Sequence, residues 1–216
     1  MQFPDRRAAG VMLGRAVAAQ GSLNPMVAAL PRGGVPVGFE VARTLGCDLD
    51  VLVVRKVGVP FHPELAMGAV AEGDVVIRNQ GIINSVGLDD ASFAAAAQTE
   101  KAELSRRLDR YRAGTPALDP GGRTVIVVDD GLATGSTALA AIEVSRVRGA
   151  SEVWLAAPVA PPEVMPAMEE AADRVIVLHQ PKRFIAVGAW YRDFSQTSDT
   201  EVGELLRQSR SGQSPE

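Results

Sequence analysis

The chain has 216 residues, of which 46% are hydrophobic and 22% are charged, with a formal net charge of −4 at pH 7. This length can bury one sizeable core, and lysine and arginine are too scattered to form the basic surface that nucleic-acid binding requires. Every apolar run is shorter than a membrane-spanning helix, and charges interrupt the N-terminal stretch where a signal peptide has its apolar core. The single cysteine, Cys47, cannot form an internal disulfide. We therefore expect a cytoplasmic protein that binds neither nucleic acid nor membranes.

The first part of the chain predicts a strand-loop-helix unit preceded by an amphipathic helix. The hydrophobic patterns place a helix over 6–19, a strand over 26–30 and a helix over 36–45. The loop of this unit contains Arg32, Gly33 and Gly34. Two glycines let the backbone approach a ligand closely, and Arg32 adds a cation for an anionic group. An ordinary Gly-Gly turn would account for the glycines but not for Arg32.

The middle of the chain predicts a strand, a hairpin and a long helix. The apolar run over 50–55 predicts a buried strand ending in Arg55 and Lys56, at the same edge of the sheet as the ligand loops if the strands are parallel. Residues 65–71 and 75–78 predict a hairpin at the edge of this sheet. A charged helix follows over 89–111. Its arginines, at 106, 107, 110 and 112, would reach a phosphate or coat a solvent-exposed face, and the second interpretation is preferred.

The most informative stretch is 125–137. Its four β-branched residues, 125–128, predict a central parallel strand that is buried on both faces. Asp129 and Asp130 follow at the carboxyl end, where open α/β sheets bind ligands. Adjacent carboxylates repel each other unless hydroxyl groups or a hydrated metal bind them.

The loop after this acidic pair has the composition of a phosphate site. It precedes a predicted helix, and free N–H groups at a helix start bind anions. Its small and hydroxyl-bearing residues are Gly131, Ala133, Thr134, Gly135, Ser136 and Thr137. A diol site followed by a phosphate site matches a ribose 5-phosphate. The alternatives are an ordinary buried strand with a glycine-rich turn, or a nucleotide-triphosphatase loop, which fits worse because it needs four residues between the glycines and a lysine after the second.

The remainder of the chain continues to alternate between helix and strand. The predicted elements are a helix over 137–148, a strand over 153–157, a helix over 163–171 and a strand over 175–178. This alternation predicts an α/β fold with a doubly wound, mainly parallel sheet. We expect a single domain over 1–207, with segments 1–24 and 181–207 around a 25–180 core. A disordered tail is expected over 208–216.

Aromatic residues are concentrated near the end of the predicted core. Residues 184–194 contain four of the ten aromatic side chains: Phe184, Trp190, Tyr191 and Phe194. Flat side chains of this kind stack on a base or close a hydrophobic cap, and the sequence leaves both roles open.

Residues 129–137, which read Asp-Asp-Gly-Leu-Ala-Thr-Gly-Ser-Thr, resemble the phosphoribosyl diphosphate (PRPP) signature of type I phosphoribosyltransferases. Residues 31–34 resemble the pyrophosphate-binding loop of the same family, and the resemblance extends through Phe194. It implies an enzyme that joins a nucleobase-like acceptor to C1 of PRPP and releases pyrophosphate. It also implies Mg²⁺ bound through PRPP near Asp129 and Asp130, without direct ligation by the protein.

The resemblance implies a role for each part of the site. Asp129 and Asp130 would hold the ribose diol, and Lys56 would meet the leaving group. The diphosphate would bind at Arg32, Gly33 and Gly34, and the 5-phosphate at the loop Ala133 to Thr137. The terminal segments would form a hood with Trp190 and Tyr191 against the acceptor, and residues 79–88 would form a mobile lid.

Ala133 bears on the acceptor, because the family's hypoxanthine and guanine enzymes have an aspartate at this position, whereas its adenine and uracil enzymes have alanine. Two other functions stay open: a PRPP- or nucleotide-binding regulatory module without turnover, and a hydrolase acting on an activated phosphoribosyl donor. The sequence also leaves open the identity of the acceptor and whether the chain forms a homo-oligomer.

Overall fold

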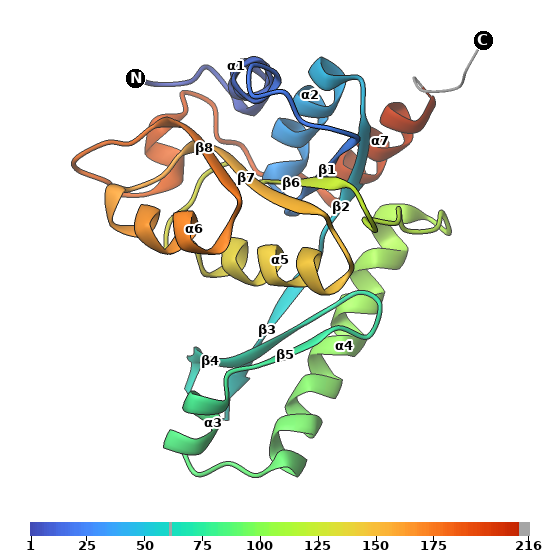
Figure 1. Cartoon of the computed structure of the whole chain (residues 1–216), viewed down its shortest axis with the longest axis vertical. Helices are drawn as coiled ribbons and strands as arrows, with labels where there is room; N and C mark the ends of the chain where they lie inside the picture. Colours follow the sequence, from blue (N-terminus) through green and yellow to red (C-terminus); the bar gives the residue numbers. More distant parts are fainter. Residues whose placement is uncertain (61, 212–216) are drawn as a thin grey trace.

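The computed structural model describes residues 1–60 and 62–211. Five parallel strands form a central sheet in the order β2-β1-β6-β7-β8 (Figure 1). They are β1 (Pro25–Ala29), β2 (Asp48–Val51), β6 (Thr124–Val128), β7 (Glu152–Val159) and β8 (Arg174–His179). The predicted fold class, a doubly wound, mainly parallel α/β sheet, is therefore confirmed.

Helices cover both faces of the central sheet (Figure 1). On one face lie α1 (Arg6–Ala18), α2 (Gly34–Leu45) and α7 (Asp199–Ser211), and on the other α5 (Ser136–Val147) and α6 (Met165–Ala171), the latter preceded by the 3₁₀ turn η1 (Pro162–Val164). Ile126 and Val128 pack against the first layer, while Val125 and Val127 pack against the second. The apolar run in β6 is continuous because both of its faces are buried.

The connections of the sheet diverge between β1 and β6. These strands are neighbours, with Ala29 opposite Val128. From β1 the chain passes through α2 to β2, and from β6 it passes through α5 to β7, on the opposite side of the sheet. In open α/β sheets, the crevice outside such a switch point binds ligands. The fold therefore brings the loops after β1 and β6 to one crevice.

Residues 54–112 form a second unit, the arm, which projects from the central sheet (Figure 1). A three-stranded antiparallel sheet packs there against a long helix. The elements of the arm are β3 (Val54–Val59), β4 (His62–Ala71), β5 (Val76–Arg78), α3 (Gln80–Ser85) and α4 (Asp90–Arg112). Met67 and Phe93 are at most 2% exposed and belong to a hydrophobic core of the arm's own.

The arm corrects two predictions. The strand predicted over 50–55 ends at Val51, and the predicted hairpin belongs to the sheet of the arm instead of the central sheet. Leu52 and Val53 are each 3% exposed, so the apolar run continues through the point where the chain leaves the central sheet. Lys56 consequently lies on β3 and not at the edge of the central sheet.

Two further segments are more regular than predicted. Residues 80–85 form α3, and Ile83 in this helix is 1% exposed, so the predicted irregular segment over 79–88 contains a packed helix. Its role as a lid stays a prediction. α7 continues to Ser211 because Leu205 and Leu206 are buried on its inner face. The predicted disorder is therefore wrong for 208–211, and residues 212–216 lie outside the described residues.

The two terminal segments meet beside the end of β7. The Phe3 N–H donates to the carbonyl of Trp190, and the Arg192 N–H donates to the carbonyl of Phe3, both at 2.8 Å. Phe3 is fully buried, and its ring packs with Tyr191 against Val159. The segment from 184 to 195, which includes the 3₁₀ turn η2 (Val187–Trp190), is thereby fixed to the N-terminal residues.

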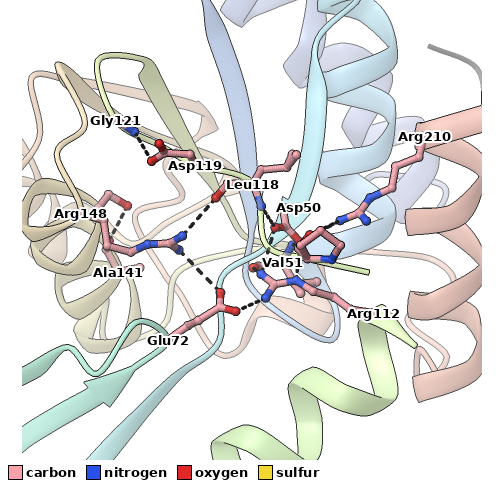
Figure 2. Close-up of polar contacts among 12 residues, drawn as sticks. Asp50, Val51, Glu72, Arg112, Leu118, Asp119, Gly121, Ala141, Arg148 and Arg210 are labelled. Carbon is pink, nitrogen blue, oxygen red and sulfur yellow. Dashed lines mark hydrogen bonds and ion pairs between the residues drawn. The ribbon is translucent and has the colours of Figure 1, made fainter. Parts of the chain in front are cut away.

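A buried ionic network joins the arm to the central sheet (Figure 2). Arg112, whose side chain is 5% exposed, donates to the carboxylate of Asp50 at 2.9 and 3.0 Å and also pairs with Glu72 in the β4–β5 turn. Arg148 lies 3.7 Å from Glu72, and Arg210 lies 3.8 Å from Asp50. A charge is tolerated at such depth only when it is paired and hydrogen-bonded.

Arg112 was predicted to lie on a solvent-exposed face of its helix, and this is wrong. The other arginines in the set pair near the surface: Arg106 and Arg107 with Glu103, and Arg110 with Asp199.

Across residues 1–60 and 62–211, the helices are too short or too polar to cross a membrane.

Candidate active site

The loop after β1 passes very close to the end of β6. The Gly34 N–H donates to the carbonyl of Leu30 at 3.0 Å, which closes the loop into a tight turn. A Cβ on Gly34 would lie 2.7 Å from the Val128 carbonyl oxygen, and a Cβ on Gly33 would overlap the carboxylate of Asp130. Gly34 therefore has no space for a side chain, and at Gly33 a side chain would displace the Asp130 carboxylate. The predicted diphosphate loop and the predicted diol site are in direct contact.

Asp129 and Asp130 are both half-buried at the carboxyl end of β6. The Asp130 N–H donates to Oδ1 of Asp129 at 2.8 Å, which fixes the first carboxylate against the loop backbone. Burial raises the pKa of Asp129 well above its ordinary value, and the negative charge of Asp130 raises it further. Burial also raises the pKa of Asp130, while Arg6 opposes that rise. Ionisation of both carboxylates is therefore unfavourable unless a cation or a hydrogen-bond donor offsets their repulsion.

The contact between Arg6 and Asp130 was not predicted from the sequence. Arg6 Nε lies 2.7 Å from Asp130 Oδ2 in an ion pair that joins residues 124 positions apart. Arg6 sits in an amphipathic helix where its charge has the usual pattern of a solvated face. The sequence therefore contains no local signal for this contact.

The loop after the acidic pair leads directly into α5. Gly135 has a φ of +70°, and a Cβ there would lie 2.7 Å from Met168 Cε, so the position favours glycine. The hydroxyl oxygens of Thr134 and Ser136 lie 2.9 Å apart. Ala133, Thr134 and Thr137 are exposed or partly exposed. The first N–H groups of α5 have no partner within the helix, so the loop can accept an anion.

Lys56 reaches this loop from the arm. Its Nζ donates to Ser136 Oγ at 2.5 Å, across the space between β3 and α5. The structure therefore brings Lys56 to the candidate phosphate loop, although by a different route from the one predicted. Its catalytic role stays a prediction.

Arg32 has its side-chain partners at and just before the start of α7. Its Nη1 lies 3.9 Å from Asp199 Oδ1 in α7 and 3.1 Å from the side-chain oxygen of Gln196, in the amide orientation that satisfies both side chains. Its side chain is 41% exposed, so it has room to turn toward a ligand. The diphosphate contact of Arg32 stays a prediction.

The two aromatic residues predicted to contact the acceptor have different environments. Tyr191 is 4% exposed, its ring lies 5.5 Å from Phe3 and 5.1 Å from Phe194, and its hydroxyl donates to the Asp130 carbonyl at 2.5 Å. It supports the acidic loop and has no free ring face. Trp190 is half-buried and meets His179 edge-on at 4.9 Å. Stacking on the acceptor stays a prediction for Trp190.

The donor set of the crevice suits Mg²⁺. The acidic pair offers carboxylate oxygens, which this hard cation prefers, and Mg²⁺ usually keeps several waters while bridging to phosphate oxygens. No three histidine, cysteine or acidic residues gather into a metal-binding group within 1–60 and 62–211. This arrangement fits a magnesium ion carried into the site by a diphosphate.

The fold and the site together define a doubly wound α/β protein with two candidate ligand loops at its switch point. The sequence profile of the phosphoribosyl transferase domain matches residues 7–188. Two relatives from Mycobacterium tuberculosis strains, whose names assign them provisionally as phosphoribosyl transferases, are 46% identical over 204 residues, or 94% of this chain. The chain belongs to the phosphoribosyl transferase family, a family of transferase enzymes.

Solved structures share this fold. The crystal structure of TT1426 from Thermus thermophilus is 42% identical to the chain, with a TM-score of 0.89, and the match covers 96% of this chain and 99% of that one. AQ2163 from Aquifex aeolicus, at 12% identity and a TM-score of 0.52 over 93% of this chain and 84% of that one, supports the fold alone. The chain spans only about half, 46%, of the length of the M. tuberculosis relatives.

Proposed function

We propose that the chain is a phosphoribosyltransferase that uses PRPP and Mg²⁺ to transfer ribose 5-phosphate to a nucleobase-like acceptor with release of pyrophosphate. The observation that supports it best is the contact between Gly33 and the carboxylate of Asp130 at the switch point. In PRPP the diphosphate is attached to C1 of the ribose, and the two hydroxyl groups are on the neighbouring C2 and C3. A diphosphate site in contact with a diol site matches this arrangement. Family membership supports the same conclusion.

Each part of the crevice would bind one part of PRPP. Asp129 and Asp130 would accept hydrogen bonds from the ribose hydroxyls, and the loop 133–137 would hold the 5-phosphate at the start of α5. The backbone at Gly33 and Gly34 would approach the diphosphate. Mg²⁺, when bound, would neutralise part of the diphosphate charge. Positioning of the donor, without a covalent intermediate, would account for most of the catalysis.

In the reaction, the bond between C1 and the diphosphate oxygen breaks, a bond forms between C1 and a ring nitrogen of the acceptor, and that nitrogen releases its proton to solvent. Pyrophosphate leaves with the electron pair, so negative charge grows on the leaving group while positive charge develops on the ribose. A cation aimed at the leaving group stabilises this transition state more than the ground state. We assign this role to Lys56, which would have to leave its contact with Ser136 in the proposed 5-phosphate loop to meet the diphosphate.

The decisive assay incubates the protein with PRPP, Mg²⁺ and a panel of nucleobases, and measures both pyrophosphate and nucleotide. A transferase gives equal amounts of the two products, and only when an acceptor is present. A hydrolase would give pyrophosphate and ribose 5-phosphate without an acceptor. A regulatory module would bind PRPP and release no pyrophosphate.

The cytoplasm, which keeps a single thiol such as Cys47 reduced, is the location that we propose.

Lys56→Ala should slow turnover more than it weakens binding of PRPP. Loss of one electrostatic donor at a transition state typically lowers kcat by about 10²–10³-fold. Steady-state kinetics should therefore show a lower kcat with a nearly unchanged KM for PRPP. The control is Lys101→Ala, a lysine of the same arm that pairs with exposed Asp74. A change in KM alone would make Lys56 a ground-state contact.

Hypoxanthine and guanine should be poor acceptors. Ala133 is exposed in the phosphate loop and offers no carboxylate to take a proton from a 6-oxopurine ring. A missing general base typically costs about 10²–10⁴-fold in rate. Initial rates of pyrophosphate release should therefore be lower with these two bases than with the best base of the panel. The best base is proposed to be held by stacking on Trp190. Comparable rates would show that Ala133 does not restrict the acceptor.

A further inference from the structure

Arg6 is held by three contacts beside the acidic pair. Its Nε donates to Asp130 Oδ2 and its Nη1 donates to the Ser195 carbonyl, both at 2.7 Å. Its guanidinium carbon lies 3.8 Å from the centroid of the Phe194 ring. The side chain is 12% exposed. A long side chain fixed in this way has lost most of its rotamer freedom, so its contacts must outweigh that entropy.

These contacts lie where the two ligand loops meet. The Oδ2 oxygen of Asp130 fills the space that a Cβ on Gly33 would need, and that Cβ would lie 3.2 Å from Arg6 Nε. Arg6 therefore contacts the carboxylate oxygen that borders the loop after β1. Arg6 donates to Oδ2 and leaves the other oxygen of Asp130, Oδ1, without a contact to its guanidinium.

The charged and polar groups around Asp130 come from three elements. Asp129 faces it from the same loop, Arg6 faces it from α1, and the Tyr191 hydroxyl approaches its carbonyl from the segment after η2. Burial raises the pKa of Asp130, and Arg6 counteracts this. Without Arg6, two neighbouring half-buried carboxylates would favour uptake of a proton. A protonated carboxyl group presents a donor where ribose hydroxyls need an acceptor.

We infer that Arg6 is a positioning residue of the PRPP site, whose guanidinium fixes one oxygen of Asp130 so that the other faces the ribose hydroxyls. The inference rests on the proposed function and extends the site to α1, an element outside both ligand loops. Because Arg6 also holds Ser195 and Phe194, it joins the ribose site to the segment proposed to contact the acceptor.

The test is calorimetric titration of the full chain with PRPP and Mg²⁺ between pH 7 and pH 9, for wild type, Arg6→Gln, Arg6→Lys and the control Arg7→Gln. Arg7 is the exposed neighbour of Arg6 in α1. Arg6→Gln should weaken binding about 10- to 100-fold at pH 7, the usual range for a hydrogen bond between charged groups. The loss should shrink as the pH rises, because burial raises the pKa of Asp130 and the variant lacks the cation that opposes this rise. Arg6→Lys, which keeps the charge but not the planar fork, should recover part of the affinity. Arg7→Gln should bind like wild type.

Wild-type affinity in Arg6→Gln, or a loss that is equal at every pH and is not recovered in Arg6→Lys, would overturn the inference. Absence of PRPP binding by the wild-type protein would instead overturn the proposed function, and this inference with it. If Arg6→Gln does not fold, the arginine Nε–H signals of the wild-type protein provide the test by NMR. The Arg6 Nε–H signal is assigned by its loss in Arg6→Lys. Its chemical shift should stay the same when Mg²⁺ and PRPP saturate the site. Movement to the position of a free arginine would show that PRPP displaces Arg6.

Discussion

The double substitution Asp129→Asn with Asp130→Asn should remove most of the binding of PRPP in the presence of Mg²⁺. Each carboxylate is proposed to accept a hydrogen bond from a ribose hydroxyl, and a hydrogen bond to a charged group contributes about 1.5–3 kcal/mol. Asparagine keeps an acceptor oxygen without the charge, which weakens each bond by about 1–1.5 kcal/mol. Two weakened bonds correspond to a decrease in affinity on the order of 100-fold, since about 1.4 kcal/mol is a factor of ten. Titration calorimetry measures this decrease directly.

The fold should survive this double substitution. Burial raises the pKa of both carboxylates, so neutral amides at these positions remove a repulsion, and the amide oxygen introduced at position 130 can still accept from Arg6. The matched control is Asp89→Asn with Asp90→Asn, a second pair of adjacent aspartates, which lies exposed at the start of α4. Asparagine also caps helices well, so the control should be folded and bind PRPP normally. Unchanged affinity in the folded 129/130 variant would mean that the acidic pair is structural.

Arg112→Leu should destabilise the protein by about 3–5 kcal/mol, the range found when one partner of a buried ion pair is removed. The substitution leaves the Asp50 carboxylate, which is 4% exposed, without its main partner, and it disconnects Glu72 in the turn of the arm. Urea unfolding should show the loss as a lower midpoint with an unchanged slope. The network in Figure 2 predicts this effect, because Arg112 joins β2 to the arm.

Arg106→Leu serves as the control for Arg112→Leu, since Arg106 belongs to the same helix and pairs with Glu103 near the surface. Exposed pairs typically contribute about 0–1 kcal/mol, so its unfolding midpoint should hardly move. Adding Asp50→Asn to Arg112→Leu should recover part of the stability by removing the uncompensated charge. Equal midpoints for the Arg112 and Arg106 variants would show that the network contributes little to stability.

The central sheet could be predicted because its strands are continuous apolar runs bounded by loops of distinctive composition. Ile126 and Val127 face opposite helical layers, which explains why the run does not alternate. The arm could not be predicted, because Leu52 and Val53 continue the apolar run while the chain leaves the central sheet. A local pattern reports burial, and it does not report which sheet a strand joins.

The candidate site shows the same division. Gly33, Gly34 and the acidic pair could be predicted, because each loop has its own local chemistry. Arg6 could not be predicted, because its contact with Asp130 depends on how α1 packs beside the end of β6. Arg112 was misassigned for a related reason: its carboxylate partners lie on other elements, and within α4 it has the pattern of an exposed charge.

A crystal structure of the protein with PRPP and Mg²⁺ tests the central claim most directly, namely that the loops after β1 and β6 form a single PRPP site. The account predicts the ribose hydroxyls within hydrogen-bonding distance of Asp129 and Asp130, the 5-phosphate at residues 133–137 and the diphosphate beside Gly33 and Gly34. Density for PRPP at another place on the chain, or a crevice without PRPP at saturating concentration, would contradict it.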